Sequence, residues 1–146
     1  MTNVTKTEFN PIAFPEATMI SVNGVVLEVF EAGQKNSGKP IMLCHGFPEH
    51  AFSWRYQIQP LVDAGYHVIV PNQRGYGKSS CPTEITDYDI EHLTGDLIAL
   101  LDHFGYKDAT FVGHDWGANI VWSLALLHPE RVNKNWSEAV VRFSGC

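Results

Sequence analysis

The residues that could do chemistry gather around one short segment, Gly113-His114-Asp115-Trp116-Gly117. An apolar run precedes this segment and a strongly apolar helix pattern follows it. The arrangement has the form of a nucleophile elbow, in which a sharp turn between a strand and a helix presents a reactive side chain; here Asp115 stands where many enzymes carry Ser. A simpler explanation is that an Asp before a helix caps it, by accepting hydrogen bonds from free backbone N–H groups. The elbow hypothesis therefore needs support from elsewhere in the chain.

A second segment, His45-Gly46-Phe47-Pro48, supplies that support because it also follows an apolar run. Next to a nucleophile elbow, an oxyanion hole takes one backbone N–H from the residue after the nucleophile and another from the loop after an earlier strand. Those donors are expected to be the N–H groups of Trp116 and Phe47. Gly46 permits a sharp turn, and Pro48 stiffens the loop and favours an extended Phe47. Each segment alone could be an ordinary turn, but together they predict a catalytic site.

Alternating strand and helix patterns are expected to hold these two segments in place. Asn23-Gly24 between apolar runs is a strong hairpin signal, because both turn positions need a positive φ angle. The carboxylates of Asp87 and Asp89 are expected to cap the helix that follows them. The chain is predicted to form, in order, a hairpin of strands 19–22 and 25–30, strand 41–44, helix 53–64, strand 66–70, helix 90–104, strand 109–112 and helix 117–127.

This order of elements predicts an α/β fold. The sheet is expected to be mostly parallel, with an N-terminal antiparallel hairpin and with helices on both faces. Sites in such sheets lie beyond the carboxyl ends of the strands, and both the His45 loop and Asp115 follow strand ends. The helix at 117–127 is apolar on nearly every face, so we expect it to be buried on nearly every face.

Composition restricts the partners and the compartment. The 146 residues suffice for one domain with a sizeable core, and a net charge of −6 without any cluster of Lys or Arg argues against nucleic acid or anionic membrane as a partner. No apolar run is long enough to cross a bilayer. Three Cys residues without a secretion signal predict reduced thiols in a cytoplasmic protein. The His and Cys residues lack metal-ligand spacing, so neither a metal nor a cofactor is expected.

Taken together, these segments resemble the epoxide hydrolase branch of the α/β-hydrolase fold family. The order and spacing agree from about Phe14 to Val132, which is most of the chain. The segments that match are 45–49, the Gly-rich loop 72–80, the elbow 113–118 and 128–132.

The resemblance implies a hydrolase that opens a small epoxide to a diol through an ester intermediate. Asp115 would be the nucleophile, since a carboxylate can displace at an alkyl carbon without a base to activate it. The backbone N–H groups of Phe47 and Trp116 would hold the oxyanion when water attacks the ester. A His oriented by an acid would activate that water, and two Tyr residues of a lid would protonate the epoxide oxygen. The residues expected to form the supporting loop are His45, Gly46 and Pro48.

Three residues separate this branch from related hydrolases. Haloalkane dehalogenases typically carry Asn where Phe47 stands, to hold the halide, and fluoroacetate dehalogenases typically carry Arg where Trp116 stands. Esterases and lipases need Ser or Cys in place of Asp115. A haloalkane dehalogenase-like hydrolase is kept as an alternative, disfavoured by Phe47.

The general base and its acid are not found in this chain. In this fold they follow the nucleophile, acid first and His later. After Asp115 the only acids are Glu130 and Glu138, and the only His is His128, at the end of the helix that leads away from the site. The resemblance fades after Val132. We therefore expect 1–14 to be an N-terminal arm, 15–132 the N-terminal half of an α/β-hydrolase domain and 133–146 a divergent tail, with the lid and the C-terminal half absent.

This organisation has a physical consequence for the strand before the elbow. That strand would lie near an exposed edge of the sheet, which invites pairing with another chain, and the apolar helix 117–127 would lose part of its cover. A non-catalytic remnant that self-associates through the exposed edge is therefore a further alternative. Turnover by this chain alone is not expected.

Overall fold

The hairpin predicted around Asn23-Gly24 forms the first edge of the sheet. The computed structural model describes residues 14–133, and in it strands β1 (Ala17–Val22) and β2 (Val25–Ala32) pair antiparallel. Both turn residues have positive φ angles, 49° and 76°, as a tight hairpin of this kind requires. The arm expected at 1–14 and the tail expected at 133–146 lie outside the described residues, except for Phe14 and Asn133.

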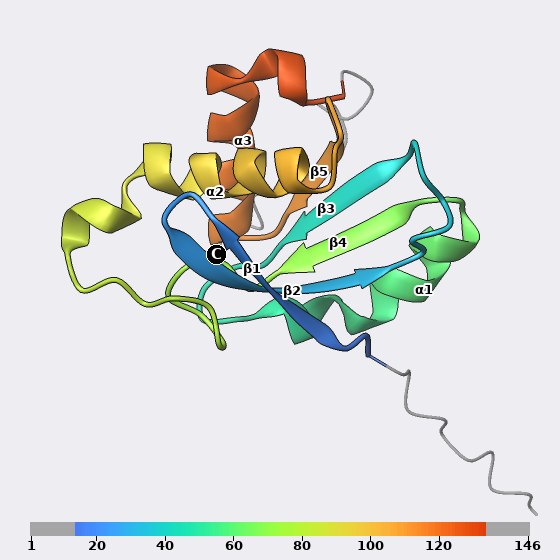
Figure 1. Ribbon diagram of the computed structural model, residues 1–146, viewed down its shortest axis with the longest axis horizontal. Coiled ribbons are helices and arrows are strands. Elements are labelled where there is room, and N and C mark those ends of the chain that lie inside the picture. The colour runs from blue at the N-terminus through green and yellow to red at the C-terminus, as the bar shows by residue number, and fades with distance from the viewer. Residues whose placement is uncertain (1–13, 134–146) are drawn as a thin grey trace, which may run out of the picture.

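Within residues 14–133, five strands form one mixed sheet in the order β1-β2-β4-β3-β5 (Figure 1). Strands β3 (Pro40–Cys44), β4 (His67–Pro71) and β5 (Thr110–Gly113) run parallel, with β3 in the middle, and the hairpin joins β4 antiparallel through β2. Every residue of these three strands is buried, as continuous apolar runs in a covered parallel sheet require. The predicted α/β fold, with its N-terminal hairpin, is confirmed.

Three α-helices connect and cover the strands. Helix α1 (Arg55–Asp63) follows a 3₁₀ turn at Ala51–Trp54, so the helix expected at 53–64 begins in the tighter form. Asp89 caps α2 (Ile90–His103), and its carboxylate accepts a hydrogen bond from the N–H of His92 at 2.9 Å. Asp87, the other expected cap, lies instead in a 3₁₀ turn before the helix. The remaining elements are α3 (Trp116–Leu127) and a 3₁₀ turn at Pro129–Arg131.

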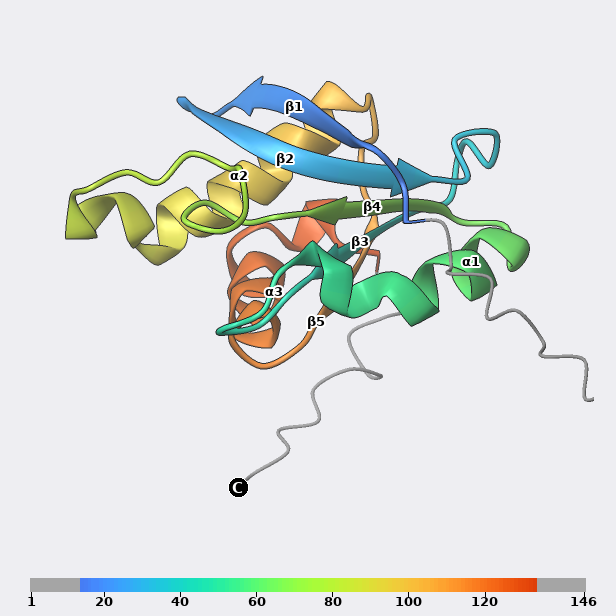
Figure 2. The ribbon, with the colours of Figure 1, turned by 90° about the horizontal axis from the view of Figure 1, so that it is seen from below.

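The helices divide the core into two clusters, one on each face of the sheet. On one face, α1 packs Ile58 against a cluster that includes Ile41 and Val112. On the other face, α2 and α3 pack together over a larger cluster, to which they contribute Leu97 and Ile120 among others. Figure 2 shows α1 and α2 on opposite sides of β3 and β4. The expectation of helices on both faces is therefore confirmed.

Helix α3 is buried on one side only, so the expectation that it is buried on nearly every face is wrong for the described chain. Ile120 and Leu124 point into the core, whereas Trp122, Leu126 and Leu127 are exposed. An apolar composition shows that a helix can be buried on any face. In the described part of the chain, however, the sheet and α2 cover only one side of α3.

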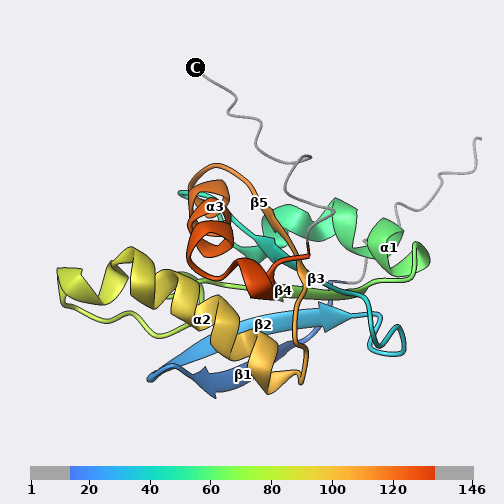
Figure 3. The same ribbon diagram turned by 90° about the horizontal axis from the view of Figure 1, so that it is seen from above.

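Strand β5 is the outermost strand on its side of the sheet, beside α3 (Figure 3). Beyond it, Val132 forms a single parallel bridge with Ala109. Backbone groups alternate between the two sides of a strand, so the N–H and C=O of Phe111 and Gly113 point to the same outer side as those of Ala109. Between residues 14 and 133, no strand pairs with that part of the edge. Nor does any described helix have the length and apolar character needed to cross a membrane.

Two leucines of α3 test this assignment of its faces. Leu124 has no exposed surface and Leu126 is 78% exposed. We expect Leu124→Ala to lower the free energy of unfolding by about 2–5 kcal/mol, because it leaves a cavity, and Leu126→Ala to change it by less than about 0.5 kcal/mol. Urea denaturation followed by circular dichroism gives both values. Similar losses in the two variants would show that Leu126 is covered in solution.

Candidate active site

Asp115 lies at the turn between β5 and α3 in a backbone conformation that few residues other than Gly adopt. Its φ and ψ angles are 55° and −119°. A positive φ angle costs free energy in residues other than Gly, and residues in this conformation are concentrated at functional sites. Asp115 occupies the N-cap position of α3, but its side chain makes no capping hydrogen bond. Helix capping therefore does not account for this Asp.

Close approach of the backbone explains the glycines around the turn. A Cβ atom on Gly46 would lie 2.6 Å from the Cβ of Asp115 and 2.8 Å from the carbonyl oxygen of His114. A Cβ on Gly117 would collide with the backbone carbonyl of Cys44. Only residues without a side chain fit at these two positions. They allow the loop after β3 and the start of α3 to touch.

The contact between the two segments is a hydrogen bond to the carboxylate. The backbone N–H of Phe47 donates to Oδ2 of Asp115 at 3.1 Å. The pKa of Asp115 lies below its ordinary value, first because of this N–H and then because of the N–H of Trp116. The structure thus brings both expected oxyanion-hole donors to the same side chain. The carboxylate is exposed and stays ionised at neutral pH.

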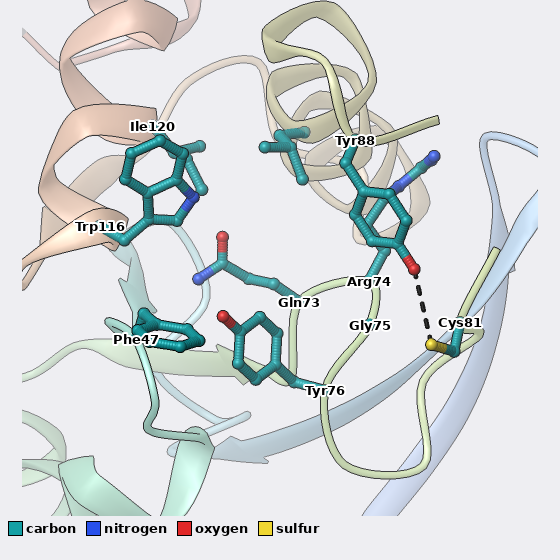
Figure 4. A pocket seen from close by; sticks show the side chains of 10 residues that line it. Phe47, Gln73, Arg74, Gly75, Tyr76, Cys81, Tyr88, Trp116 and Ile120 are labelled. Atoms are coloured by element: carbon teal, nitrogen blue, oxygen red, sulfur yellow. Dashed lines mark hydrogen bonds between the residues drawn. The ribbon is translucent and has the colours of Figure 1, made fainter. Parts of the chain in front are cut away.

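A cleft of about 380 Å³ is lined by Phe47, whose N–H binds this carboxylate, and by Trp116, the residue after Asp115 in the chain. Figure 4 shows the side chains of Phe47 and Trp116 at one side of it, with Tyr76 and Gln73 between them and the rest of the wall. Phe47 is 69% exposed, so its ring is free to contact a ligand. Burial, and then the charge of Asp115, raise the pKa of Tyr76, which keeps its hydroxyl protonated. The far wall includes Tyr88, whose hydroxyl donates to the sulfur of Cys81 at 3.5 Å.

The supporting loop is organised around His45, which is buried under the site. Its ring lies 3.0 Å from the carbonyl oxygen of Gly46 through Nδ1, and Nε2 accepts the backbone N–H of Gln73 at 3.1 Å. Burial lowers the pKa of His45. The peptide bond between Phe47 and Pro48 is cis.

An ion pair missed by the sequence analysis fixes the opposite wall of the cleft. Arg74 makes two hydrogen bonds to the carboxylate of Asp96 on α2, both at 2.7 Å, and a third to the carbonyl oxygen of Asp87 at 2.6 Å. The two charged side chains are almost fully buried. Removal of one partner from a buried pair of this geometry strongly destabilises the folded protein. It holds the Gly-rich loop against the helix.

Neither His114 nor His128 is placed to act on Asp115. His114 turns its ring to Glu49, with Nδ1 3.3 Å from the carboxylate. His128 lies at the other end of α3, about 18 Å along the helix from its start, and faces Glu130 at 3.8 Å. In the described part of the chain no His hydrogen-bonds Asp115, and no three His, Cys, Asp or Glu side chains group to hold a metal ion.

Comparison with known proteins places this site in a family. A model of the alpha/beta hydrolase fold matches residues 39–140, so the chain belongs to the α/β-hydrolase fold family. It is 56% identical over 119 residues to epoxide hydrolase A of Mycobacterium tuberculosis, covering 81% of this chain and 36% of that protein. It is 45% identical over 126 residues to bifunctional epoxide hydrolase 2 of Sus scrofa, covering 86% of this chain and 22% of that protein. Within the family, the chain is a member of the epoxide hydrolase branch.

A solved structure supports the same assignment. The crystal structure of epoxide hydrolase A from Mycobacterium thermoresistibile matches with a TM-score of 0.78 at 55% identity, over 81% of this chain and 37% of that one. The resemblance drawn from the motifs is confirmed for family and branch. The chain spans little more than a third of the length of either mycobacterial relative.

Titration of the Asp115 carboxyl tests the contact with Phe47. We expect its midpoint in the folded chain to lie below that of the same carboxyl in urea, because only the folded state supplies the two N–H donors. The folded pKa is the lower one, so the stability that this group contributes is present above the ordinary pKa and is lost as the pH falls through the lowered value. NMR of the carboxyl carbon measures both midpoints.

The variant Gly46→Ala sharpens this test. Its Cβ would push the loop away from Asp115, so the folded midpoint should rise towards the ordinary value. A folded wild-type chain with an ordinary midpoint would contradict the hydrogen bond.

Proposed function

We propose that this chain carries the nucleophile and the oxyanion hole of an epoxide hydrolase acting on a small-molecule epoxide. One observation carries the proposal: an ionised, exposed carboxylate at a strained elbow, held by the N–H of Phe47 beside an aromatic cleft. A carboxylate is a sufficient nucleophile for an alkyl carbon, whereas a hydroxyl would need a base. The activities named for the relatives agree with this chemistry.

In the proposed reaction, the two carboxylate oxygens of Asp115 have separate tasks. Phe47 holds Oδ2, which leaves Oδ1 to attack a ring carbon. That attack forms an ester bond, breaks a C–O bond of the epoxide and leaves an alkoxide, which takes up a proton. Water then attacks the ester, and Oδ2, now the carbonyl oxygen, becomes the oxyanion within reach of the Phe47 and Trp116 donors. The product is a diol.

The second step needs a base that we do not assign to this chain. The resemblance implies a His with an acid for the hydrolysis, and two Tyr residues of a lid for the proton. Among residues 14–133, no His hydrogen-bonds Asp115. We propose that the chain by itself stops at the ester, so that each molecule reacts only once. The expected cytoplasmic location also stays a prediction.

Haloalkane dehalogenation fits the cleft less well. Releasing a halide needs side-chain donors that stabilise the leaving anion. The Phe47 ring at the cleft offers none. Measurement of halide release from a haloalkane discriminates the two chemistries, and release would favour the dehalogenase alternative.

Reaction with a small aryl epoxide tests the proposed nucleophile. We expect mass spectrometry of the intact chain to show an increase of one epoxide mass, located on Asp115 by peptide mapping. Asp115→Asn should abolish the adduct, because the amide is a poor nucleophile. Asp63→Asn is the matched control, since Asp63 lies on α1 and accepts a hydrogen bond from Gln59, and it should form the adduct normally. Diol production at the rates of full-length relatives would overturn the proposed arrest at the ester.

A second proposal follows from the outer edge of β5. Among residues 14–133, no strand pairs with the outer backbone groups of Phe111 and Gly113. They lie next to an apolar trough of about 430 Å³ between β3, β5 and α1, and an open strand edge beside apolar surface favours association. We propose that a second copy of the chain pairs there. The trough is lined by Ile41, Leu43, Trp54, Tyr56, Gln57, Pro60, Leu61 and Val112.

Light scattering coupled to size exclusion tests this association. Tyr56→Lys places a charge on the trough and should lower the apparent mass at a given concentration. Ile85→Lys is the control, because Ile85 is 90% exposed and lies away from the trough. A chain that is monomeric at every concentration would exclude the pairing.

A further inference from the structure

The peptide group between Gly46 and Phe47 is held from both ends. Its N–H donates to Oδ2 of Asp115 at 3.1 Å. Its C=O lies 3.0 Å from Nδ1 of His45 and also accepts the N–H of Glu49 at 3.0 Å. A trans peptide is planar, and its N–H and C=O point in opposite directions. Whatever fixes the carbonyl therefore also fixes where the N–H points.

Its neighbours determine which nitrogen of His45 carries the proton. The backbone N–H of Gln73 can only donate, so Nε2 of His45, 3.1 Å away, must accept and be unprotonated. The Gly46 carbonyl can only accept, so Nδ1 must carry the hydrogen. The side chain of Gln73 also donates to the carbonyl oxygen of His45 at 2.8 Å. The edge of the ring of Tyr76 packs on the imidazole, with centroids 4.6 Å apart.

We propose that His45 is a positioning residue of the oxyanion hole, whose neutral Nδ1–H tautomer aims the N–H of Phe47 at Asp115. The inference rests on the proposed function of Asp115 and adds to it a residue that does not touch the substrate. A carbonyl that accepts hydrogen bonds also polarises its own peptide, which strengthens the N–H as a donor. His45 thus acts on the site through the backbone of the next two residues.

The arrangement fails when His45 is protonated. A proton on Nε2 would place two donors face to face, His45 and the N–H of Gln73, and the loop would have to move. The titratable groups around the ring are Glu49 and His50 of its own loop, Tyr76 of the Gly-rich loop and, through the peptide, Asp115. Burial lowers the pKa of His45, so this failure is expected at a pH below the ordinary His value of about 6.5.

Two amide variants separate positioning from packing. In His45→Asn the side-chain amide reaches the place of Nδ1 and can still donate to Gly46, but it cannot titrate. In His45→Gln the amide reaches the place of Nε2 and serves Gln73 instead. Both variants bury a neutral amide of similar size. If His45 served only to fill space, variants with similar free energies of unfolding would also have similar rates of ester formation and similar Asp115 midpoints.

The experiment measures the rate of ester formation on Asp115 by intact mass and the Asp115 midpoint by NMR. We expect His45→Gln to raise the midpoint towards the ordinary value, because the Phe47 N–H no longer points at Oδ2. The rate of ester formation should then rise severalfold, because a carboxylate without that donor is a stronger nucleophile. His45→Asn should keep the wild-type rate and a low midpoint. It should also lack the rise in rate that we expect of the wild type below about pH 6.5, where protonation of His45 releases the same donor. The exposed His103 on α2 is the control, and His103→Asn should keep that rise.

The outcomes distinguish this inference from the proposed function. If the wild type forms no ester, the proposed function fails, but the Asp115 midpoints still report the aim of the Phe47 N–H. Equal midpoints in His45→Asn and His45→Gln, or a rise in rate below about pH 6.5 that persists in His45→Asn, would overturn the positioning role.

Discussion

The site depends on one contact, the hydrogen bond from the backbone of Phe47 to the carboxylate of Asp115, 68 residues later in the chain. It exists because β3 and β5 are parallel neighbours and end together, with Cys44 opposite Gly113. Sheet register therefore sets the distance between the two loops. Gly46 and Gly117 then remove the side chains that would keep them apart. Strand order, register and glycine placement all meet in this single bond.

A buried polar network behind the site holds the same geometry from below. Asn72 accepts the N–H of Ala51 at 2.7 Å and donates to Glu28 on β2 at 2.7 Å. Ser79 donates to the Asn72 carbonyl and accepts the N–H of Glu28. Every polar group in this set has a partner, which is the condition under which buried polar groups specify a unique structure. The Gly-rich loop 72–80 is one of the segments whose sequence resembles the family. Through Gln73 it also holds His45 in place.

The sequence predicted features that depend on local signals and missed those that depend on packing. The Asn23 turn and the order of strands and helices follow from turn chemistry and from hydrophobic period, and both were correct. The ion pair of Arg74 and Asp96 could not be predicted, because the two residues are 22 positions apart in the sequence and neither belongs to a local motif. The faces of α3 could not be predicted either. Exposure of Leu126 depends on what packs around the helix, and its own composition contains no such information.

The two steps proposed for Asp115 ask opposite things of the same donors. During attack on the epoxide, negative charge leaves the carboxylate, so the N–H groups that lower its pKa also weaken it as a nucleophile. During hydrolysis the charge returns to Oδ2, and the same N–H groups stabilise it. The hydrogen bond from Phe47 therefore favours the second step at some expense of the first. An arrangement of this kind is useful only where ester hydrolysis would otherwise be the slower step. In that case the direction of the Phe47 N–H, and the His45 ring that fixes this direction, affect the rate of the whole reaction.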